Sequence, residues 1–381
     1  MQLRRASGIL MHLTSLPGEF GIGSLGRNAR DFIDFLSAAG QRYWQILPTG
    51  PTGYGDSPYQ TFSAFAGNPL LIDFEELVTQ GWLLPDDLRD HPEFPANSIP
   101  YGEVINYRFP ILRQAYSRFQ PNRDFEDFLK NNSFWLMDFS LFMALKNHFQ
   151  GQPWQSWPEE YRKRDQASLQ EIQTELSDEI RYQQFLQYLF FRQWSALLAY
   201  AHSRNINIIG DIPIFVAMDS ADAWAHPGIF QFDADCNPLY IAGVPPDFFS
   251  ETGQLWGNPL YNWEELQRNG YQWWKDRFRL ILQLVDLVRV DHFRGFAGYW
   301  AVPYGEKTAI KGEWLPAPGQ DLFNKLKSEF GELPVIAEDL GVITEDVVAL
   351  RDEFGFPGMK ILQFAFGSDE SNPFLPHLYP E

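Results

Sequence analysis

Two acidic residues that follow strand-like apolar runs are the side chains best placed to do chemistry. Asp291 ends the segment Asp286-Leu-Val-Arg-Val-Asp291, and Glu338 follows Val335-Ile-Ala337. A carboxylate at the C-terminal tip of a parallel strand points into the mouth of an α/β barrel, where such folds place their active sites. Cleavage or transfer at a glycosidic bond needs two carboxyl groups that face one cleft. The pair therefore predicts chemistry on sugars.

Charged side chains crowd around Asp291, because Arg289, His292 and Arg294 all lie within three positions of it. Such a charge density at the end of a buried strand is costly unless a polar ligand uses it. Arg289 precedes Asp291 by two residues, so it falls on the same side of the strand and favours the ionised carboxylate that a nucleophile requires. A purely structural ion pair at the strand end is the competing interpretation.

Glu338 and Asp211 each allow two interpretations. Apolar neighbours would raise the pKa of Glu338 so that it can donate a proton, whereas a salt-bridged or capping Glu before the Leu340-Gly341 turn would be structural. Asp211, in Gly210-Asp-Ile-Pro-Ile214, also lies near the end of a strand. It either binds sugar hydroxyls or orients Arg289, or it caps the following turn, and these two roles stay open.

Aromatic residues in Gly- and Pro-rich segments indicate a flat, apolar ligand surface. The chain is 16% aromatic, and Tyr59 and Trp256 lie in Tyr54-Gly-Asp-Ser-Pro-Tyr-Gln60 and Gly253-Gln-Leu-Trp-Gly-Asn-Pro259. Irregular backbone of this kind is usually at the surface, where exposed aromatic side chains are typical of binding sites. Sugar faces pack on such rings. Local packing within the loop is the alternative.

Composition excludes several classes of partner. The formal net charge of −19 argues against nucleic acid, which is held by clusters of Lys and Arg. A single cysteine, Cys236, excludes an internal disulfide, and the apolar run Ile9-Leu-Met11 is too short for a signal peptide or a membrane span. The seven histidines lack metal-site spacing. We therefore expect a cytoplasmic protein without membrane contact, metal or cofactor.

Two short motifs resemble ligand loops, but their contexts argue against that. Gly21-Ile-Gly-Ser-Leu-Gly26 matches a dinucleotide fingerprint, yet a loop separates it from the preceding strand and no acidic residue follows the next strand to hold a ribose. Glycines that ease the start of a helix are the preferred interpretation. Asp233-Ala-Asp-Cys-Asn237 begins like a calcium loop but continues with Pro238, so a turn between two short strands is expected.

The apolar runs predict a parallel α/β fold with an insertion. Near-continuous hydrophobicity is typical of strands that are covered on both faces, and helical periodicity separates several of the runs. About 150 residues lie between the second and third runs, far more than a normal crossover, and they carry amphipathic helical patterns. We expect barrel strands 1–2 in residues 1–65, a mostly helical inserted subdomain in 66–200, and strands 3–6 in 201–381. Residues 221–263 have the composition of long active-site loops. The six expected strands are Gly8–His12, Tyr43–Leu47, Ile206–Ile212, Leu284–Val290, Pro334–Ala337 and Met359–Phe364.

With these residues assembled, the chain resembles the amylomaltases, the 4-α-glucanotransferase or disproportionating-enzyme family. The resemblance spans nearly the whole chain in the family's order. The matching segments are Ser15-Leu-Pro-Gly18, Gly21-Ile-Gly23, Trp44-Gln-Ile-Leu-Pro48, Ser57-Pro-Tyr-Gln60, Ser63-Ala-Phe-Ala-Gly-Asn-Pro69, Gly210-Asp-Ile-Pro-Ile214, Ala242-Gly-Val-Pro-Pro-Asp247, Gly253-Gln-Leu-Trp-Gly-Asn-Pro259, Arg289-Val-Asp-His-Phe-Arg294 and Ala337-Glu-Asp-Leu-Gly341.

The resemblance implies a (β/α)₈ TIM-type barrel with helical insertions and a retaining transfer between α-1,4-glucans. It implies maltooligosaccharides, amylose or glycogen-derived glucans as ligands. Asp291 would be the nucleophile and Glu338 the acid and base. The other residues that it marks as substrate-binding are Arg289, His292, Asp211 and Tyr59 around the cleaved bond, Trp256 and Gln254 on the acceptor side, Asp247, and Tyr54 and Tyr101 in a second glucan-binding groove.

The chain departs from the family pattern in one respect. The family uses a third carboxylate, in a His-Asp-Asn motif at the end of the seventh strand, but this sequence ends at Glu381 after the sixth expected strand. Only six of eight barrel strands are therefore expected here, as in a fragment of a longer enzyme or in a degenerate relative. A hydrolase on the same scaffold and a non-catalytic glucan-binding protein remain alternatives to the transferase, with an oxidoreductase as a distant fourth.

Overall fold

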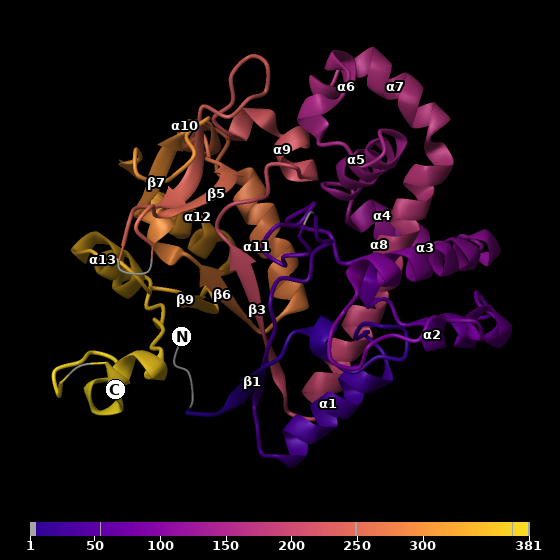
Figure 1. Cartoon of the computed structure of the whole chain (residues 1–381), viewed down its shortest axis with the longest axis horizontal. Coiled ribbons are helices and arrows are strands. Elements are labelled where there is room, and N and C mark those ends of the chain that lie inside the picture. Colours follow the sequence, from indigo (N-terminus) through magenta and orange to yellow (C-terminus); the bar gives the residue numbers. More distant parts are fainter. Residues whose placement is uncertain (1–4, 54, 248–249, 368, 380–381) are drawn as a thin grey trace.

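The computed structural model describes residues 5–53, 55–247, 250–367 and 369–379. Within them, a central sheet of five parallel strands has the order β1-β2-β3-β6-β9, so that neighbours in the sheet follow one another along the chain (Figure 1). This succession is that of a barrel wall. The strands are β1 (Gly8–Leu10), β2 (Tyr43–Gln45), β3 (Asn207–Pro213), β6 (Leu287–Asp291) and β9 (Val335–Ala337).

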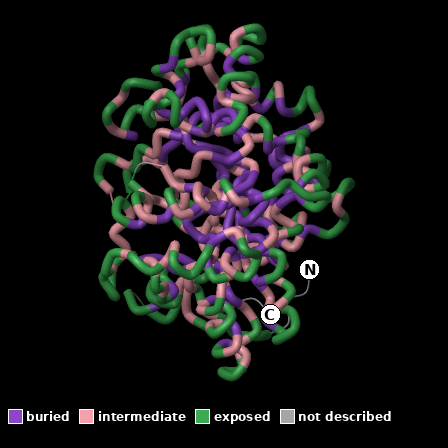
Figure 2. The backbone as a smooth tube through the Cα atoms, turned by 90° about the vertical axis from the view of Figure 1, so that its right-hand side faces the viewer, coloured by how far each residue is buried: buried purple, intermediate pink, exposed green. Residues whose placement is uncertain are grey.

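Helices cover the sheet and explain why its strands are so apolar. Trp44, Ile208, Val288 and Val335 are fully buried, and buried segments run through the middle of the molecule (Figure 2). Parallel strands that are covered on both faces carry near-continuous hydrophobic residues. The covering helices include α1 (Arg27–Ala38), α8 (Ser177–Ser203), α11 (Gln272–Leu284), α12 (Gly319–Phe330) and α13 (Glu345–Glu353).

The segment between β2 and β3 is helical. In the described residues it carries α2 (Phe74–Thr79), α3 (Tyr101–Arg118), α4 (Arg123–Asn131), α5 (Leu136–His148), α6 (Glu159–Arg162), α7 (Gln166–Glu175) and α8. These helices gather on one side of the sheet, at the right of Figure 1, and α8 leads directly into β3.

Two glutamines on α8 tie this helical region to the chain that leaves β2. The side-chain amide of Gln187 accepts from Gly67 N and donates to Gly67 O at 2.8 and 3.0 Å. Gln193 does the same to Asp73 N and O at 2.7 and 3.0 Å. Each amide thus satisfies one buried donor and one buried acceptor of the backbone, as a neighbouring strand would.

A second, antiparallel sheet lies beside the first, at the upper left of Figure 1. Its strands are in the order β5-β4-β7-β8. The prediction that residues 221–263 form long loops is therefore wrong for β4 and β5. The pairing of β4 with β7 joins segments about sixty residues apart, which leaves no hairpin signal in the sequence. The elements are β4 (Tyr240–Val244), β5 (Gln254–Pro259), β7 (Gly298–Pro303) and β8 (Glu313–Pro316), with α9 (Ala221–Ala225) and α10 (Trp263–Arg268) beside them.

The sixth predicted strand, Met359–Phe364, is also wrong. Residues Leu362–Phe366 form a short 3₁₀ helix. The backbone N–H of Met359 donates to the side chain of Asp339 at 2.7 Å and not to a strand, so the ladder beyond β9 does not continue. The predicted helix start is confirmed, because α1 begins directly after Gly26. Residues 233–237 form the predicted turn, but an isolated bridge between Phe232 and Pro238 flanks it in place of the two short strands.

Candidate active site

The pairing of β3 with β6 brings the first charged residues together. Asp211 lies opposite Arg289 and Pro213 opposite Asp291 in the parallel register. Arg289 Nη1 donates to both carboxylate oxygens of Asp211 at 2.8 Å, and its Nη2 lies 2.8 Å from Asp291 Oδ1. The guanidinium therefore bridges two carboxylates, one buried and one partly exposed at the strand tip. The fork of Arg donors suits this geometry.

Tyr59 extends this network from the loop that follows β2. Its hydroxyl donates to Asp211 Oδ2 at 2.7 Å. Burial, followed by the nearby charge of Asp211, raises the pKa of Tyr59, so the phenol stays protonated. Of the two roles considered for Asp211, the contacts match the one that orients Arg289.

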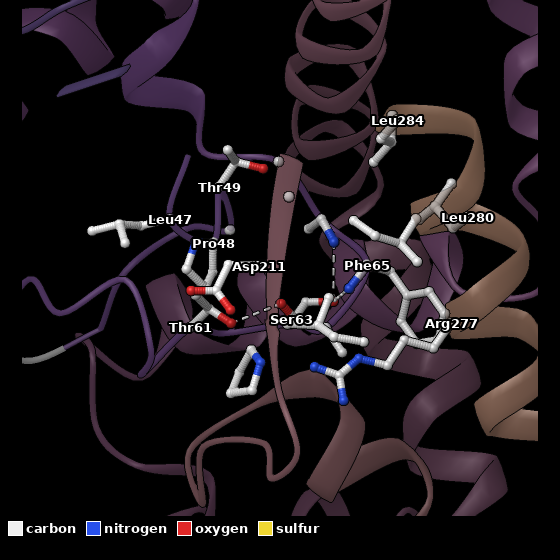
Figure 3. Close-up of a pocket in the computed structure, with 18 of the residues that line it drawn as sticks. Leu47, Pro48, Thr49, Thr61, Ser63, Phe65, Asp211, Arg277, Leu280 and Leu284 are labelled. Atoms are coloured by element: carbon white, nitrogen blue, oxygen red, sulfur yellow. Dashed lines mark hydrogen bonds between the residues drawn. The ribbon is translucent and has the colours of Figure 1, made fainter. Parts of the chain in front are cut away.

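Burial strongly affects the protonation of Asp211. Its side chain is almost fully buried, and this raises its pKa to about 6 despite the opposing effect of Arg289. Behind β3, a narrow cavity of about 60 Å³ separates the strand from Phe65, Leu280 and Leu284 (Figure 3). Asp211 lines this cavity together with these apolar side chains. Burial alone would lower the pKa of Arg289, but Asp211 and Asp291 more than offset this and raise it.

Glu338 reaches the same strand end from β9. Its Oε2 accepts the backbone N–H of His292 at 2.8 Å, and its Oε1 accepts that of Leu340 at 3.1 Å. The first bond places Glu338 beside the residue that follows Asp291. Burial and the charge of Asp291 raise the pKa of Glu338, while the two N–H bonds and Arg289 oppose the shift. The net direction is the one that a proton donor needs.

His292 has an unusual backbone and a neutral ring. Its φ of 52° is left-handed, and its backbone N–H donates to Glu338. Burial, with Arg294 nearby, lowers the pKa of His292 to about 3. Its Nε2 is buried and has no hydrogen-bond partner within the described part of the protein. The ring meets Trp256 edge to face, with centroids 4.7 Å apart.

A cleft of about 370 Å³ adjoins these groups. Tyr59, Asp291, His292 and Trp256 line it, together with Gln60, Asn258 and the segment 213–215. Trp256 Nε1 donates to Gln254 Oε1 at 3.1 Å, so the two residues predicted for the acceptor side lie together on β5. A mostly apolar cleft with a few convergent polar groups and shifted pKa values is the usual form of a binding site.

Sequence reasoning missed two amides in the cleft, Gln60 and Asn258. Gln60 Nε2 donates to Asn258 Oδ1 at 3.4 Å, and the buried Asn258 donates to Val216 O at 2.7 Å. Both lie in the segments that were singled out for Tyr59 and Trp256. Their position beside those aromatic residues was the only available signal.

Two of the predicted residues, Asp247 and Tyr101, lie away from the cleft. The carboxylate of Asp247 accepts the backbone N–H of Ser250 at 2.8 Å, and Asp247 is exposed and does not line the cleft. Tyr101 begins α3 and does not line it either; burial raises its pKa. Tyr54 lies outside the described residues.

No group of three His, Cys, Asp or Glu side chains in the described ranges could hold a metal ion. Among the helices described, none is both long and apolar enough to cross a membrane.

Comparison with known proteins gives the family. The family model for 4-alpha-glucanotransferase matches residues 11–381. A 4-alpha-glucanotransferase of Thermus thermophilus is 53% identical over 386 residues, covering 100% of this chain and 76% of the relative. The chain belongs to the 4-α-glucanotransferase family. A family member from Synechocystis is 51% identical, over 99% of this chain and 76% of its own length.

The fold agrees with this family. The amylomaltase of Streptococcus agalactiae, solved in complex with acarbose, matches with a TM-score of 0.96 and 43% identity, over 99% of this chain and 78% of that protein. This likeness to a glucanotransferase structure confirms the predicted barrel-type α/β fold. As a member of this family, the chain is an enzyme of the glycosyltransferase type.

Proposed function

We propose that this chain moves segments of α-1,4-linked glucans to the 4-hydroxyl of an acceptor sugar by a retaining double displacement. The observation that carries the proposal is the coupling of two carboxyl groups at the ends of the neighbouring strands β6 and β9. Asp291 is held by Arg289, and Glu338 is held by the N–H of the very next residue, His292. Retaining enzymes place their two carboxyl groups about 5–5.5 Å apart, and Asp291 is near enough to Glu338 for its charge to raise the pKa of Glu338. The acarbose complex of the similar amylomaltase supports a glucan ligand.

In the first step, a carboxylate oxygen of Asp291 attacks the anomeric carbon while the glycosidic C–O bond breaks. Glu338 gives its proton to the departing sugar oxygen. In the second step, Glu338 takes the proton of the acceptor 4-hydroxyl as that oxygen attacks the anomeric carbon and the bond to Asp291 breaks. The ion pair with Arg289 holds the Asp291 carboxylate in place for the first step, and the raised pKa of Glu338 favours its protonated form.

The surrounding residues then have distinct tasks. Arg289 keeps Asp291 oriented and is itself held by Asp211. The ring of His292 lines the cleft, and Tyr59 offers a ring to a sugar face. Trp256 and Gln254 supply an acceptor side, where a bound sugar would exclude the water that otherwise ends the reaction. Tyr54, Tyr101 and Asp247 are proposed, with less support, to contact glucan outside the cleft.

The test is to incubate the 381-residue chain with maltotriose and to separate the products. Transfer yields glucose together with maltopentaose and longer chains. Glucose and maltose without longer chains would indicate hydrolysis instead of transfer. The absence of any product from a folded sample would contradict the proposal for this chain. Asp291→Asn is the control that should abolish all products. The kcat/KM of the parent should fall as pH rises through the pKa of Glu338, because the first step needs its proton.

A further inference from the structure

Asp339, the neighbour of Glu338, does not line the cleft and is almost completely buried. Its side chain is 6% exposed. Oδ1 accepts the backbone N–H of Met359 at 2.7 Å, and Oδ2 is paired with Arg351 of α13. Successive residues of an extended chain point in opposite directions. Asp339 and Glu338 therefore share one stretch of backbone but make different contacts, Asp339 with Met359 and Arg351 and Glu338 with the N–H groups of His292 and Leu340.

The segment that Asp339 holds is fitted closely against it. The N–H of Ala337 donates to Pro357 O at 2.9 Å, which attaches this segment at its start. At Gly358, a Cβ atom would lie 2.4 Å from Asp339 Oδ2, so only glycine allows the chain to pass the carboxylate this closely. The segment 357–359 is therefore fixed to the end of β9 by backbone on one side and by the Asp339 carboxylate on the other.

Met359 carries this attachment into the candidate active site. Its sulfur lies 3.4 Å from Arg289 Nε, as a hydrogen-bond acceptor. The other two nitrogens of that guanidinium contact Asp211 and Asp291. All three nitrogens of Arg289 are thus engaged, and Met359 occupies the direction that the carboxylates leave open. A planar guanidinium held on three sides has little freedom to tilt.

We propose that Asp339 is a positioning residue for both reacting carboxyl groups. It acts on Glu338 through the shared backbone, and on Asp291 through Met359 and Arg289. The inference rests on the proposed function, since it concerns the groups that perform the transfer. Misplacing such groups by about 1 Å can cost about 100-fold in rate, so a contact that touches no substrate can still control turnover.

The kinetic test compares Asp339→Ala with Asp339→Asn and with Asp352→Ala. Asp352 is the matched control, because it also binds Arg351 but is exposed and does not touch Met359. We expect Asp339→Ala to lower kcat at least about 10-fold while KM for maltotriose changes less than about 2-fold. Asp339→Asn should recover much of kcat, because its Oδ1 can still accept the Met359 N–H. Equal losses in Asp339→Ala and Asp352→Ala, or an unchanged kcat in a folded Asp339→Ala, would overturn the proposal.

Amide hydrogen exchange supplies a second readout that does not require turnover. Asp339→Ala should speed exchange at Met359 and also at His292 and Leu340, whose N–H groups hold Glu338. Asp352→Ala should leave these three rates unchanged. If the parent chain makes no product, the proposed function fails, yet the exchange data still decide this inference. Faster exchange confined to Met359 would mean that Asp339 fixes only its own segment, and would refute positioning of Glu338.

Discussion

Replacing Asp211 with Asn should make the protein more stable at neutral pH while impairing catalysis. Burial raises the pKa of Asp211 from 3.8 to about 6. Each pKa unit corresponds to about 1.4 kcal/mol, so the shift corresponds to about 3 kcal/mol. Because the folded-state pKa is the higher one, the folded protein binds more protons between about pH 4 and pH 6. The free energy of unfolding therefore falls as pH rises through this window.

The asparagine variant keeps the shape of the site without the buried charge. Its Oδ1 can accept from Arg289, and its Nδ2 can donate to the Tyr59 hydroxyl, which also accepts hydrogen bonds. At pH 7 the variant should be more stable than the parent by up to about 3 kcal/mol, with a flatter stability profile between pH 4 and 6. Transfer should fall by about 100-fold, because Arg289 loses the carboxylate that orients it toward Asp291.

The assay is urea unfolding followed by tryptophan fluorescence and circular dichroism at several pH values from 4 to 7. Asp127→Asn, an exposed carboxylate in α4, is the control and should leave the pH dependence unchanged. If Asp211→Asn is less stable than the parent at pH 7 by 1 kcal/mol or more, the reasoning is refuted. The attraction between Asp211 and Arg289 would then outweigh the cost of burying the charge.

Two further predictions concern the backbone around the site. His292→Gly should tolerate the left-handed φ of 52° and keep the N–H bond to Glu338, whereas His292→Val should be less stable than His292→Gly by about 1–2 kcal/mol and less active. Urea unfolding measures the stability of the two variants, and initial rates measure their activity. Equal stability and activity in the two variants would contradict a strained backbone at this position. Gln187→Leu leaves the N–H and C=O of Gly67 unpaired and should cost about 2–5 kcal/mol of stability. The control Gln184→Leu, on the same helix, should cost little. Thermal unfolding measures both losses, and similar losses in the two variants would contradict the prediction.

The parallel strands were predictable because their burial on two faces leaves continuous apolar runs, as at Ile206–Ile212 and Leu284–Val290. The carboxylates at their ends followed from the rule that parallel strands expose their C-terminal tips at one edge. The run Met359–Phe364 misled for a physical reason. It has strand-like composition, but the Asp339 side chain takes its first N–H, and Leu362 and Phe364 stay exposed.

Other features depend on contacts between distant segments, which composition does not encode. The second sheet pairs β4 with β7, and its strands are interrupted by Gly and Pro. The hydrogen bond from Tyr59 to Asp211 joins residues about 150 positions apart. The resemblance to amylomaltases marked both residues as substrate-binding, but only the structure shows them in contact. No sequence pattern indicates that the backbone N–H of His292 donates a hydrogen bond to Glu338.

The two glutamines on α8 that bind the backbone of Gly67 and Asp73 also restrict where the chain can gain or lose residues. Gln187 and Gln193 are six positions apart, and so are the residues that they hold, Gly67 and Asp73. Six residues of helix rise about 9 Å and make about one and two-thirds turns, so the held segment must follow the helix surface at a fixed length. An inserted or deleted residue between 67 and 73 would break the backbone hydrogen bonds of one of these two glutamines. Among relatives that keep both glutamines, insertions and deletions should therefore fall outside this interval.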